Sequence, residues 1–295
     1  MRYSGKVTVW LMIACMGALV APGQNFSDMK VEKVAAGFTF TEGPVWSREG
    51  FLVFSDVPGG KIMKWTPGEG VSIIRAKSNG ASGNAYDAQG RLYTCETAGR
   101  RVVRQDKKGK IEVVAERWDG KRLNAPNDIV VRKDGELYFT DPAFGSQQDA
   151  RELDFFGVFH VSRKGVLDVV AKWKTRPNGI ALSASGHLLY VANSDERSVL
   201  AYDLDKAGEA SGERVFVSHI VGVPNGVRVD EKGNVYVAAK DVNVYTSEGK
   251  PLIHIPLADG PSNMAFGDPD FGTLYITART AVYRVRLDVK GAIQY

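Results

Sequence analysis

Three asparagines in this chain each follow a proline at the start of a turn-forming phrase. The phrases APND at 125–128, RPNG at 176–179 and VPNG at 223–226 contain Asn127, Asn178 and Asn225. One such phrase indicates only a turn, because proline presets φ and asparagine tolerates positive φ. The amide oxygen of asparagine is also a ligand that hard cations accept. Recurrence at intervals of roughly 50 residues indicates stacked units that bring equivalent side chains together.

The same register selects polar residues elsewhere in the chain. Asn127 and Asn225 lie ten residues before an aliphatic strand residue, and Asn178 lies eleven before one. This offset also selects Glu42 of TEGPVW, Ser82 of GASGNAY and, with one inserted residue, Asn263 of GPSNMAF. One carboxylate with several amide and hydroxyl oxygens suits Ca²⁺, with Zn²⁺, Mn²⁺ or Mg²⁺ as substitutes, although not all six are expected to bind directly.

The element that must position these residues is a recurring block of glycine, an aliphatic-aromatic strand and a small or acidic end. Its copies read REGFLVFSD, AQGRLYTCE, KDGELYFTD, SGHLLYVAN, EKGNVYVAA and DFGTLYITA. Further alternating runs give each unit about four short antiparallel strands. We therefore predict an all-β six-bladed β-propeller with four antiparallel strands per blade, in which residues just before the innermost strands surround one channel. A pair of β-sandwiches is the alternative, but it would not need six equivalent units.

The two ends of the chain carry separate signals. Residues 1–23 have a basic start, an apolar run and small residues, which is the layout of a signal peptide, and 24–295 would then form one propeller domain. Cleavage after Ala21 or lipid modification of Cys15 are rival interpretations. We expect an exported protein, periplasmic or secreted, whose only remaining cysteine is Cys95. The stretch 31–40 and the terminal AVYRVRLDV are expected to close the ring together.

Composition excludes several classes of protein. The chain has 295 residues, of which 44% are hydrophobic and 24% are charged, so a large core is available and disorder is excluded. The net charge of +4 is spread without a Lys/Arg block, which argues against a nucleic-acid partner. The four histidines have no ligand-like spacing, and we assign none a catalytic role.

With these motifs the chain resembles the SMP-30, gluconolactonase and luciferin-regenerating enzyme family of calcium-dependent six-bladed propellers. The resemblance covers nearly everything after residue 23. It rests on TEGPVW, GKRLNAPNDIVVRKDGELYFTDPAFG, RPNGIALS, YVANS, PNGVRVDEKGNVYVA and SNMAFGDPDFGTLYIT. It implies that Glu42 is the metal-binding glutamate and that Asn127 and Asn178 are the metal-site asparagines.

The fifth blade departs from the family pattern. The family's usual Pro-Asp-Gly turn is Pro224-Asn225-Gly226 here. Asn225 keeps an oxygen for the metal but removes one negative charge, so we expect weaker calcium binding and the loss of a candidate base. Asp128 and Asp195 are candidates to compensate, and the sequence does not orient either one.

The resemblance implies calcium-dependent hydrolysis of sugar lactones, with a metal in the channel polarising the carbonyl and activating water. We expect Glu42, Asn127 and Asn225 to act in catalysis, and Arg122 and Asn124, with Asn127, to contact a small lactone or sugar-derived substrate. Phe144, Phe155 and Phe156 are candidates for a lid that hinges at Gly145, or for blade packing. The chain contains no GxSxG nucleophile motif.

Two rival functions remain open. One is phosphotriester or organophosphate hydrolysis, and the other is a noncatalytic ligand-binding propeller with a structural metal. We expect a monomer or homodimer, without membrane association after processing unless Cys15 is lipidated.

Overall fold

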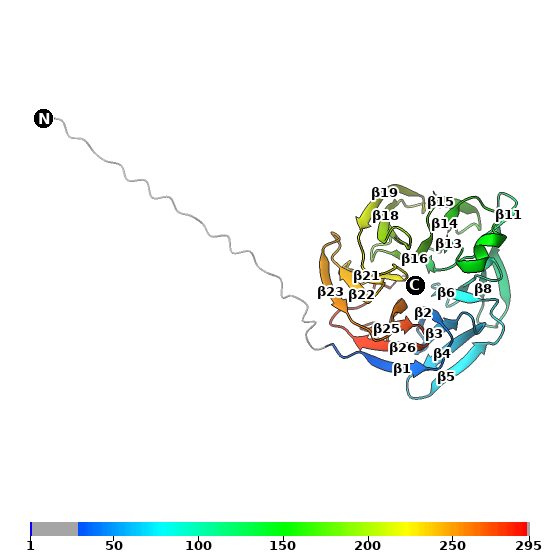
Figure 1. The fold of residues 1–295 in the computed structure, drawn as a ribbon, viewed down its shortest axis with the longest axis horizontal. Helices are drawn as coiled ribbons and strands as arrows, with labels where there is room; N and C mark the ends of the chain where they lie inside the picture. Colours follow the sequence, from blue (N-terminus) through cyan, green and yellow to red (C-terminus); the bar gives the residue numbers. More distant parts are fainter. Residues whose placement is uncertain (2–28, 294–295) are drawn as a thin grey trace.

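Six four-stranded antiparallel sheets surround a central channel in the computed structural model, which describes Met1 and residues 29–293 (Figure 1). This arrangement confirms the predicted six-bladed propeller. The predicted signal peptide, with Cys15, lies outside the described residues apart from Met1. Blades 1 to 3 comprise β2 (Thr41–Ser47), β3 (Phe51–Asp56), β4 (Lys61–Thr66) and β5 (Gly70–Arg75); β6 (Ala81–Tyr86), β7 (Leu92–Glu96), β8 (Arg101–Gln105) and β9 (Ile111–Ala115); and β12 (Ile129–Val131), β13 (Leu137–Asp141), β14 (Phe156–Val161) and β15 (Leu167–Trp173).

The remaining blades follow the same order, with the exception of the last. Blades 4 and 5 comprise β16 (Pro177–Leu182), β17 (Leu188–Asn193), β18 (Ser198–Leu204) and β19 (Ala210–Val217); and β20 (Val227–Val229), β21 (Val235–Ala238), β22 (Val242–Tyr245) and β23 (Pro251–Ile255). Blade 6 comprises β24 (Pro261–Gly267), β25 (Thr273–Ala278), β26 (Ala281–Arg286) and β1 (Glu32–Ala36). Its outermost strand therefore comes from the other end of the chain, as expected.

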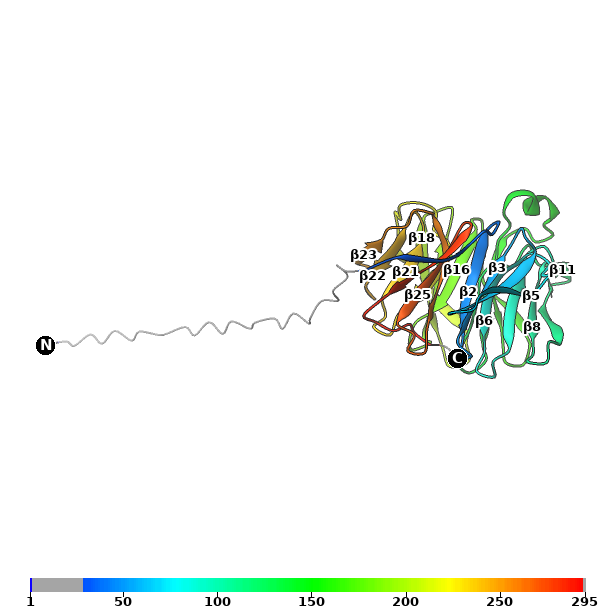
Figure 2. The same ribbon diagram turned by 90° about the horizontal axis from the view of Figure 1, so that it is seen from below.

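The core lies between neighbouring blades. Each of the six hydrophobic clusters formed by described residues joins two adjacent blades. Between blades 6 and 1, for example, Trp46 stacks on Tyr275 with ring centroids 5.1 Å apart. Alternation along each strand directs apolar side chains to both faces of a blade, so successive blades pack face to face around the ring (Figure 2).

The repeated turn phrase is explained by the close approach of neighbouring inner strands. The N–H of Gly83 donates to Asn127 O at 2.7 Å, and that of Gly179 donates to Asn225 O at 2.9 Å. A Cβ at Gly179 would lie only 2.2 Å from that same oxygen. Glycine is needed after the repeated polar residue because no side chain fits between the blades.

The sixth blade corrects the predicted register. The N–H of Gly226 donates to Ser262 O, so Ser262 is equivalent to the repeated asparagines. Asn263 is instead equivalent to Asp128. The N–H of Asn263 donates to Thr277 Oγ1 at 3.1 Å, just as the N–H of Asp128 donates to Thr140 Oγ1 at 3.1 Å. The prediction of Asn263 at the repeated position was therefore wrong by one residue.

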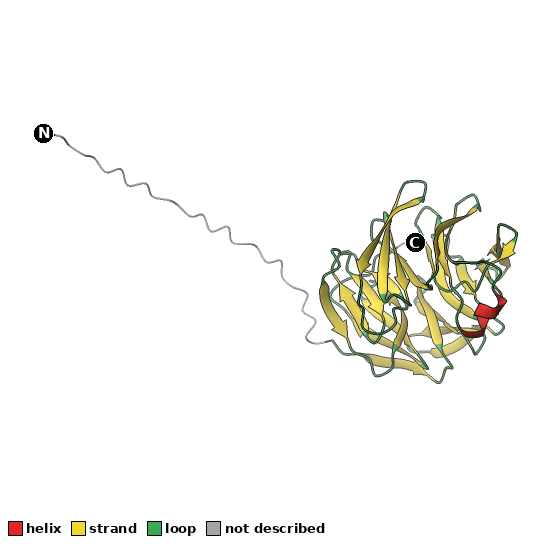
Figure 3. Ribbon diagram, turned by 45° about the horizontal axis from the view of Figure 1, so that its top comes forward, coloured by secondary structure: helices red, strands yellow, loops and turns green. Residues whose placement is uncertain are grey.

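Little helix accompanies the sheets. A 3₁₀ helix, η1 (Gly145–Ala150), follows β13 and lies at the rim of the ring (Figure 3). A small hairpin of β10 (Arg117–Trp118) and β11 (Lys121–Arg122) precedes blade 3. Across residues 29–293, no helix has the length and apolar character needed to span a membrane.

Candidate metal centre in the central channel

The four predicted metal ligands lie at one end of the inner strands, in four different blades. Glu42 and Asn178 are the second residues of β2 and β16, while Asn127 and Asn225 lie two residues before β12 and β20. The inter-blade hydrogen bonds place them at equivalent positions around the channel. The fold therefore brings together the oxygen ligands that the sequence predicted.

Glu42 supplies a buried carboxylate. Glu42 is only 5% exposed. Its Oε2 accepts hydrogen bonds from the N–H of Gly43 at 2.9 Å and from Asn263 Nδ2 at 3.3 Å. Burial and, to a smaller extent, the Asp128 carboxylate raise the pKa of Glu42, and the hydrogen bonds from Gly43, Asn263 and Asn225 oppose this rise, so that the pKa is about 7. A carboxylate in this position is strongly favoured by a cation beside it.

Asn178 presents an amide oxygen that the protein leaves without a donor. Its Nδ2 donates to Ser194 Oγ at 3.0 Å, and Ser194 Oγ in turn donates to Pro224 O at 2.9 Å. This chain fixes the orientation of the amide. Asn178 Oδ1 is buried and has no hydrogen-bond partner among the described residues. A buried oxygen without a donor is costly unless a water or an ion satisfies it, so Asn178 fits the metal that the family implies.

Asn127 is held by its backbone and not by its side chain. Its N–H donates to Thr140 O at 2.8 Å, and its carbonyl accepts from Gly83. In the described part of the chain no hydrogen bond involves its side chain, so its amide oxygen is also available. Among the described residues, no three or more His, Cys, Asp or Glu side chains are grouped so that they could hold a metal ion by themselves. The donor set of one carboxylate and three amides suits a hard, oxygen-preferring cation.

Asp128 lies in the channel beside Glu42, and both oxygens of its carboxylate accept hydrogen bonds. It is 1% exposed, and Oδ1 accepts from the N–H of Ile129 at 3.0 Å. Oδ2 accepts from the Ile180 N–H at 3.2 Å, Asn263 Nδ2 at 3.3 Å and Arg228 Nη1 at 3.2 Å. Because Asn263 Nδ2 also bonds Glu42, this one carboxylate links blades 3, 4, 5 and 6 to blade 1.

The two aspartates that the sequence left unoriented therefore differ. Asp128 adds negative charge near Glu42, but its occupied oxygens make it a positioning group and not a free base. Asp195 accepts from the N–H of Arg176 at 2.8 Å and pairs with the Arg176 guanidinium, which lowers the pKa of Asp195. It is committed to this pair and makes no contact with Glu42.

The two residues proposed to contact substrate are tied to the surrounding loops. Arg122 donates from Nη2 to Gly99 O at 2.9 Å. Asn124 is buried, and Nδ2 donates to Asp141 O at 3.1 Å and Phe155 O at 3.0 Å. Both amide hydrogens of Asn124 are thereby used, whereas its Oδ1 is buried and has no hydrogen-bond partner among the described residues. Asn124 also positions the loop before Asn127.

The predicted lid divides into two parts. Phe155 and Phe156 are buried, and Phe155 packs edge to face on Trp118 with centroids 5.5 Å apart. These two residues belong to blade packing. Phe144 precedes η1 and lies under the guanidinium of Arg176, 4.9 Å from its ring centroid. Only the segment from Phe144 through η1 remains a candidate lid.

Sequence analysis missed one residue that matters to the site and misplaced another. Arg228 lies inside the alternating run of β20, where nothing marks it as a channel residue, and Asn263 lies one residue away from its predicted register. Among the histidines, His160 is buried against Glu136 at 2.7 Å in blade 3, away from the channel centre. The four histidines stay without an assigned catalytic role.

Comparison with known proteins agrees with the fold. A gluconolactonase of Zymomonas mobilis is 33% identical over 88% of this chain and 82% of its own length. The structure of a gluconolactonase from Xanthomonas campestris has a TM-score of 0.82 and 32% identity, covering 88% of this chain and 90% of that one. A diisopropyl-fluorophosphatase of Loligo vulgaris is 25% identical over 89% of this chain and 94% of its own length.

Fold and site together define a six-bladed propeller with an oxygen-lined centre in its channel. The model of the SMP-30/Gluconolactonase/LRE-like region matches residues 40–280. The chain belongs to this family.

Proposed function

We propose that this protein is a calcium-dependent lactonase that acts on sugar lactones. The observation that carries the proposal is that the same end of the channel holds a buried carboxylate, Glu42, and a buried amide oxygen, that of Asn178, which has no hydrogen-bond donor among the described residues. Asn127 and Asn225 occupy equivalent positions in two other blades. The 33% identity to a gluconolactonase over most of the chain supports the same reaction class. A bound divalent cation would supply Lewis acidity toward a carbonyl oxygen and toward water.

The chain's own residues have separable roles. Glu42 provides the negative charge that holds a cation and is itself held by Gly43 and Asn263. Asn178 and Asn127 offer neutral oxygens whose orientation is fixed by Ser194 and by backbone hydrogen bonds. Asn225 donates to Glu42, so its amide both orients that carboxylate and offers an oxygen.

The test is lactone hydrolysis by the purified protein after chelation and again after calcium addition. Aldonolactones are compared with a simple aliphatic lactone. We expect activity to fall on chelation and to return with calcium, and Glu42→Gln to abolish this rescue. Asp203→Asn, which alters an exposed pair with Arg214, is the matched control and should behave as the wild type. A folded protein that stays inactive while calcium still raises its melting temperature would favour a noncatalytic binding propeller.

Phosphotriester hydrolysis is the second candidate, because the Loligo vulgaris phosphatase resembles this chain along nearly its whole length. The same centre would bind a phosphoryl oxygen. A paraoxon assay run beside the lactone panel separates the two: a higher kcat/KM for paraoxon than for every lactone would replace the lactonase proposal.

A further inference from the structure

The channel is divided into two chambers by a ring of six residues. Each of these six residues comes directly after one of the repeated polar residues in the sequence. They are Asp128, Asn263 and four glycines, Gly43, Gly83, Gly179 and Gly226. A Cβ at Gly226 would lie 2.2 Å from Asn263 Oδ1, so the two polar side chains fill the space that the glycines leave open. The candidate metal centre lies on one side of this ring.

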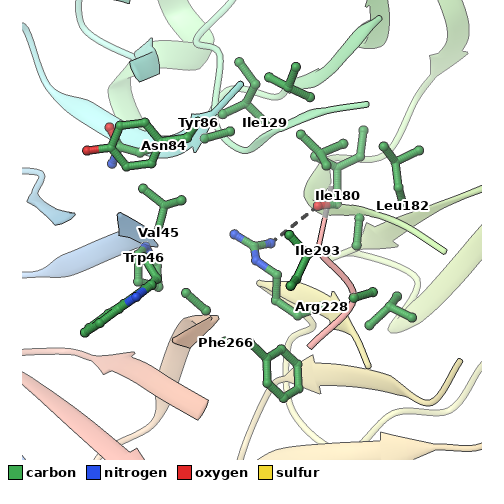
Figure 4. A pocket seen from close by; sticks show the side chains of 18 of the residues that line it. Val45, Trp46, Asn84, Tyr86, Ile129, Ile180, Leu182, Arg228, Phe266 and Ile293 are labelled. Carbon is green, nitrogen blue, oxygen red and sulfur yellow. Dashed lines mark hydrogen bonds between the residues drawn. The ribbon is translucent and has the colours of Figure 1, made fainter. Parts of the chain in front are cut away.

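The second chamber lies beyond the ring, along the inner strands. It is a pocket of about 100 Å³ lined mainly by aliphatic and aromatic side chains (Figure 4). None of the four candidate metal ligands lines it, and Ile293 is among the residues that do. Asn84 is satisfied, since it donates to Gly43 O and Ser55 Oγ and accepts from Thr94. Burial raises the pKa of Tyr86 to about 12, so this phenol is neutral.

Arg228 is the single charged residue in the lining of this chamber. Its Nη1 donates to Asp128 Oδ2, Ile180 O and Val227 O. In Figure 4 the guanidinium lies among the pocket side chains, with its bond to Ile180 on one side. Within residues 29–293, Nε and Nη2 have no partner. This leaves the edge of the guanidinium that forms paired hydrogen bonds with a carboxylate.

The remaining edge of the guanidinium is open to this chamber. Arg228 is paired with Asp128 through Nη1 and its side chain is 17% exposed, so water can reach Nε and Nη2 when no ligand is bound. The lining contains no acidic residue that would compete for these two donors. The chamber has room for several waters, since one water needs roughly 10 to 15 Å³. A ligand of roughly six non-hydrogen atoms is the size that fits.

We propose that this second chamber is a separate binding site, for a small monocarboxylate with a short apolar chain. The carboxylate accepts two hydrogen bonds from Nε and Nη2 of Arg228. The chain packs against side chains such as Val45, Ile129 and Phe266. This site does not depend on the proposed lactonase activity, because it lies beyond the ring and none of the four candidate metal ligands lines it.

The test is calorimetric binding of butyrate to the folded, chelated protein at fixed ionic strength. Butyramide, which has the same shape without the charge, is the matched ligand. We expect butyrate to bind and butyramide to bind at least tenfold more weakly. Arg228→Met should weaken butyrate binding at least tenfold, whereas Arg214→Met, on the exposed face of blade 4, should leave it unchanged.

Two further variants keep the result interpretable. Ala265→Leu fills the chamber without altering Arg228, so it should also reduce butyrate binding if Arg228→Met fails to fold. Glu42→Gln should retain binding, which distinguishes this chamber from the metal centre. Equal binding of butyrate and butyramide, unchanged binding in both chamber variants, or loss of binding in Glu42→Gln would overturn the proposal.

Discussion

The carboxylate of Glu42 is buried, and this burial determines how the stability of the protein responds to metal. Its pKa of about 7 lies above its unfolded value, so the folded state binds the extra proton. Without metal, this group's contribution to stability is lost as pH rises from about 4.5 to about 7. We expect metal-free Glu42→Gln to be more stable than the wild type at pH 8 by about 1 to 3 kcal/mol.

Calcium should reverse that order. It should raise the melting temperature of the wild type and leave that of Glu42→Gln nearly unchanged, as measured by thermal unfolding in chelator and in calcium. An equal calcium-induced rise in both proteins would place the metal away from Glu42.

Asn225 is the residue at which charge is missing relative to the family pattern. Asn225→Asp should tighten calcium binding roughly tenfold, because it adds a second carboxylate to the ligand set. In chelator it should lower stability, since the new charge faces Glu42. Calcium titration by calorimetry measures the first effect and urea unfolding the second. Asn243→Asp, elsewhere in blade 5, is the matched control; equal affinities for Asn225→Asp and wild type would exclude Asn225 as a ligand.

Among the elements, the loop that carries Asn127 is anchored by a buried carboxylate. Asp141 accepts from the N–H groups of Asn124 at 2.7 Å and Ala125 at 2.8 Å. Burial nevertheless raises the pKa of Asp141 to about 7. The carboxylate form is therefore disfavoured in the folded state between about pH 4 and 7. The stability of Asp141→Asn relative to the wild type should rise over this range, by at most about 1.4 kcal/mol per pH unit in urea unfolding. A difference that does not change with pH would contradict the assignment.

The inner strands depend on glycine for close approach and not only for turn geometry. Gly179→Ala places a Cβ 2.2 Å from a backbone oxygen of the next blade, whereas a Cβ at Gly60, where φ is +63°, meets nothing within 4 Å. We expect Gly179→Ala to cost about 3 kcal/mol or more, and Gly60→Ala about 1 kcal/mol. Urea unfolding of both variants checks this, and equal costs would show that the blades separate easily.

For the whole molecule, ring closure is the feature with the largest expected effect on stability. Removing residues 1–36 deletes β1 and exposes β26 as an unpaired edge. We expect the loss of several kcal/mol and a tendency to aggregate, measured by urea unfolding and light scattering. Glu32→Ala removes exposed ion pairs with Arg284 and Lys30 and should cost less than about 1 kcal/mol. Similar stabilities for the truncated chain and the wild type would show that β1 is dispensable.

The fold was predictable from the sequence because its unit repeats, whereas the contacts across the channel were not. A glycine followed by a strand recurs six times, and an offset of ten residues before the strand selects Glu42, Asn127 and Asn225, while an offset of eleven selects Asn178. Asn263 was placed one residue away from its register because the turn between β24 and β25 spans five residues, 268–272, whereas the turn between β2 and β3 spans three, 48–50. The Asp128–Arg228 pair joins residues 100 positions apart with no local pattern. The donors of Asn124 are used by Asp141 and Phe155, neighbours that only the folded loop provides.

The pairing of β1 with β26 also determines when the ring can close during synthesis. Glu32 and Arg284 are 252 positions apart, so the first strand must wait for nearly the whole chain before it finds its partner. At roughly 5 to 20 residues per second, that delay is about 10 to 50 s. Throughout it, the growing arc of blades has an open face at each end. The nascent chain therefore spends most of its synthesis as an unfinished ring.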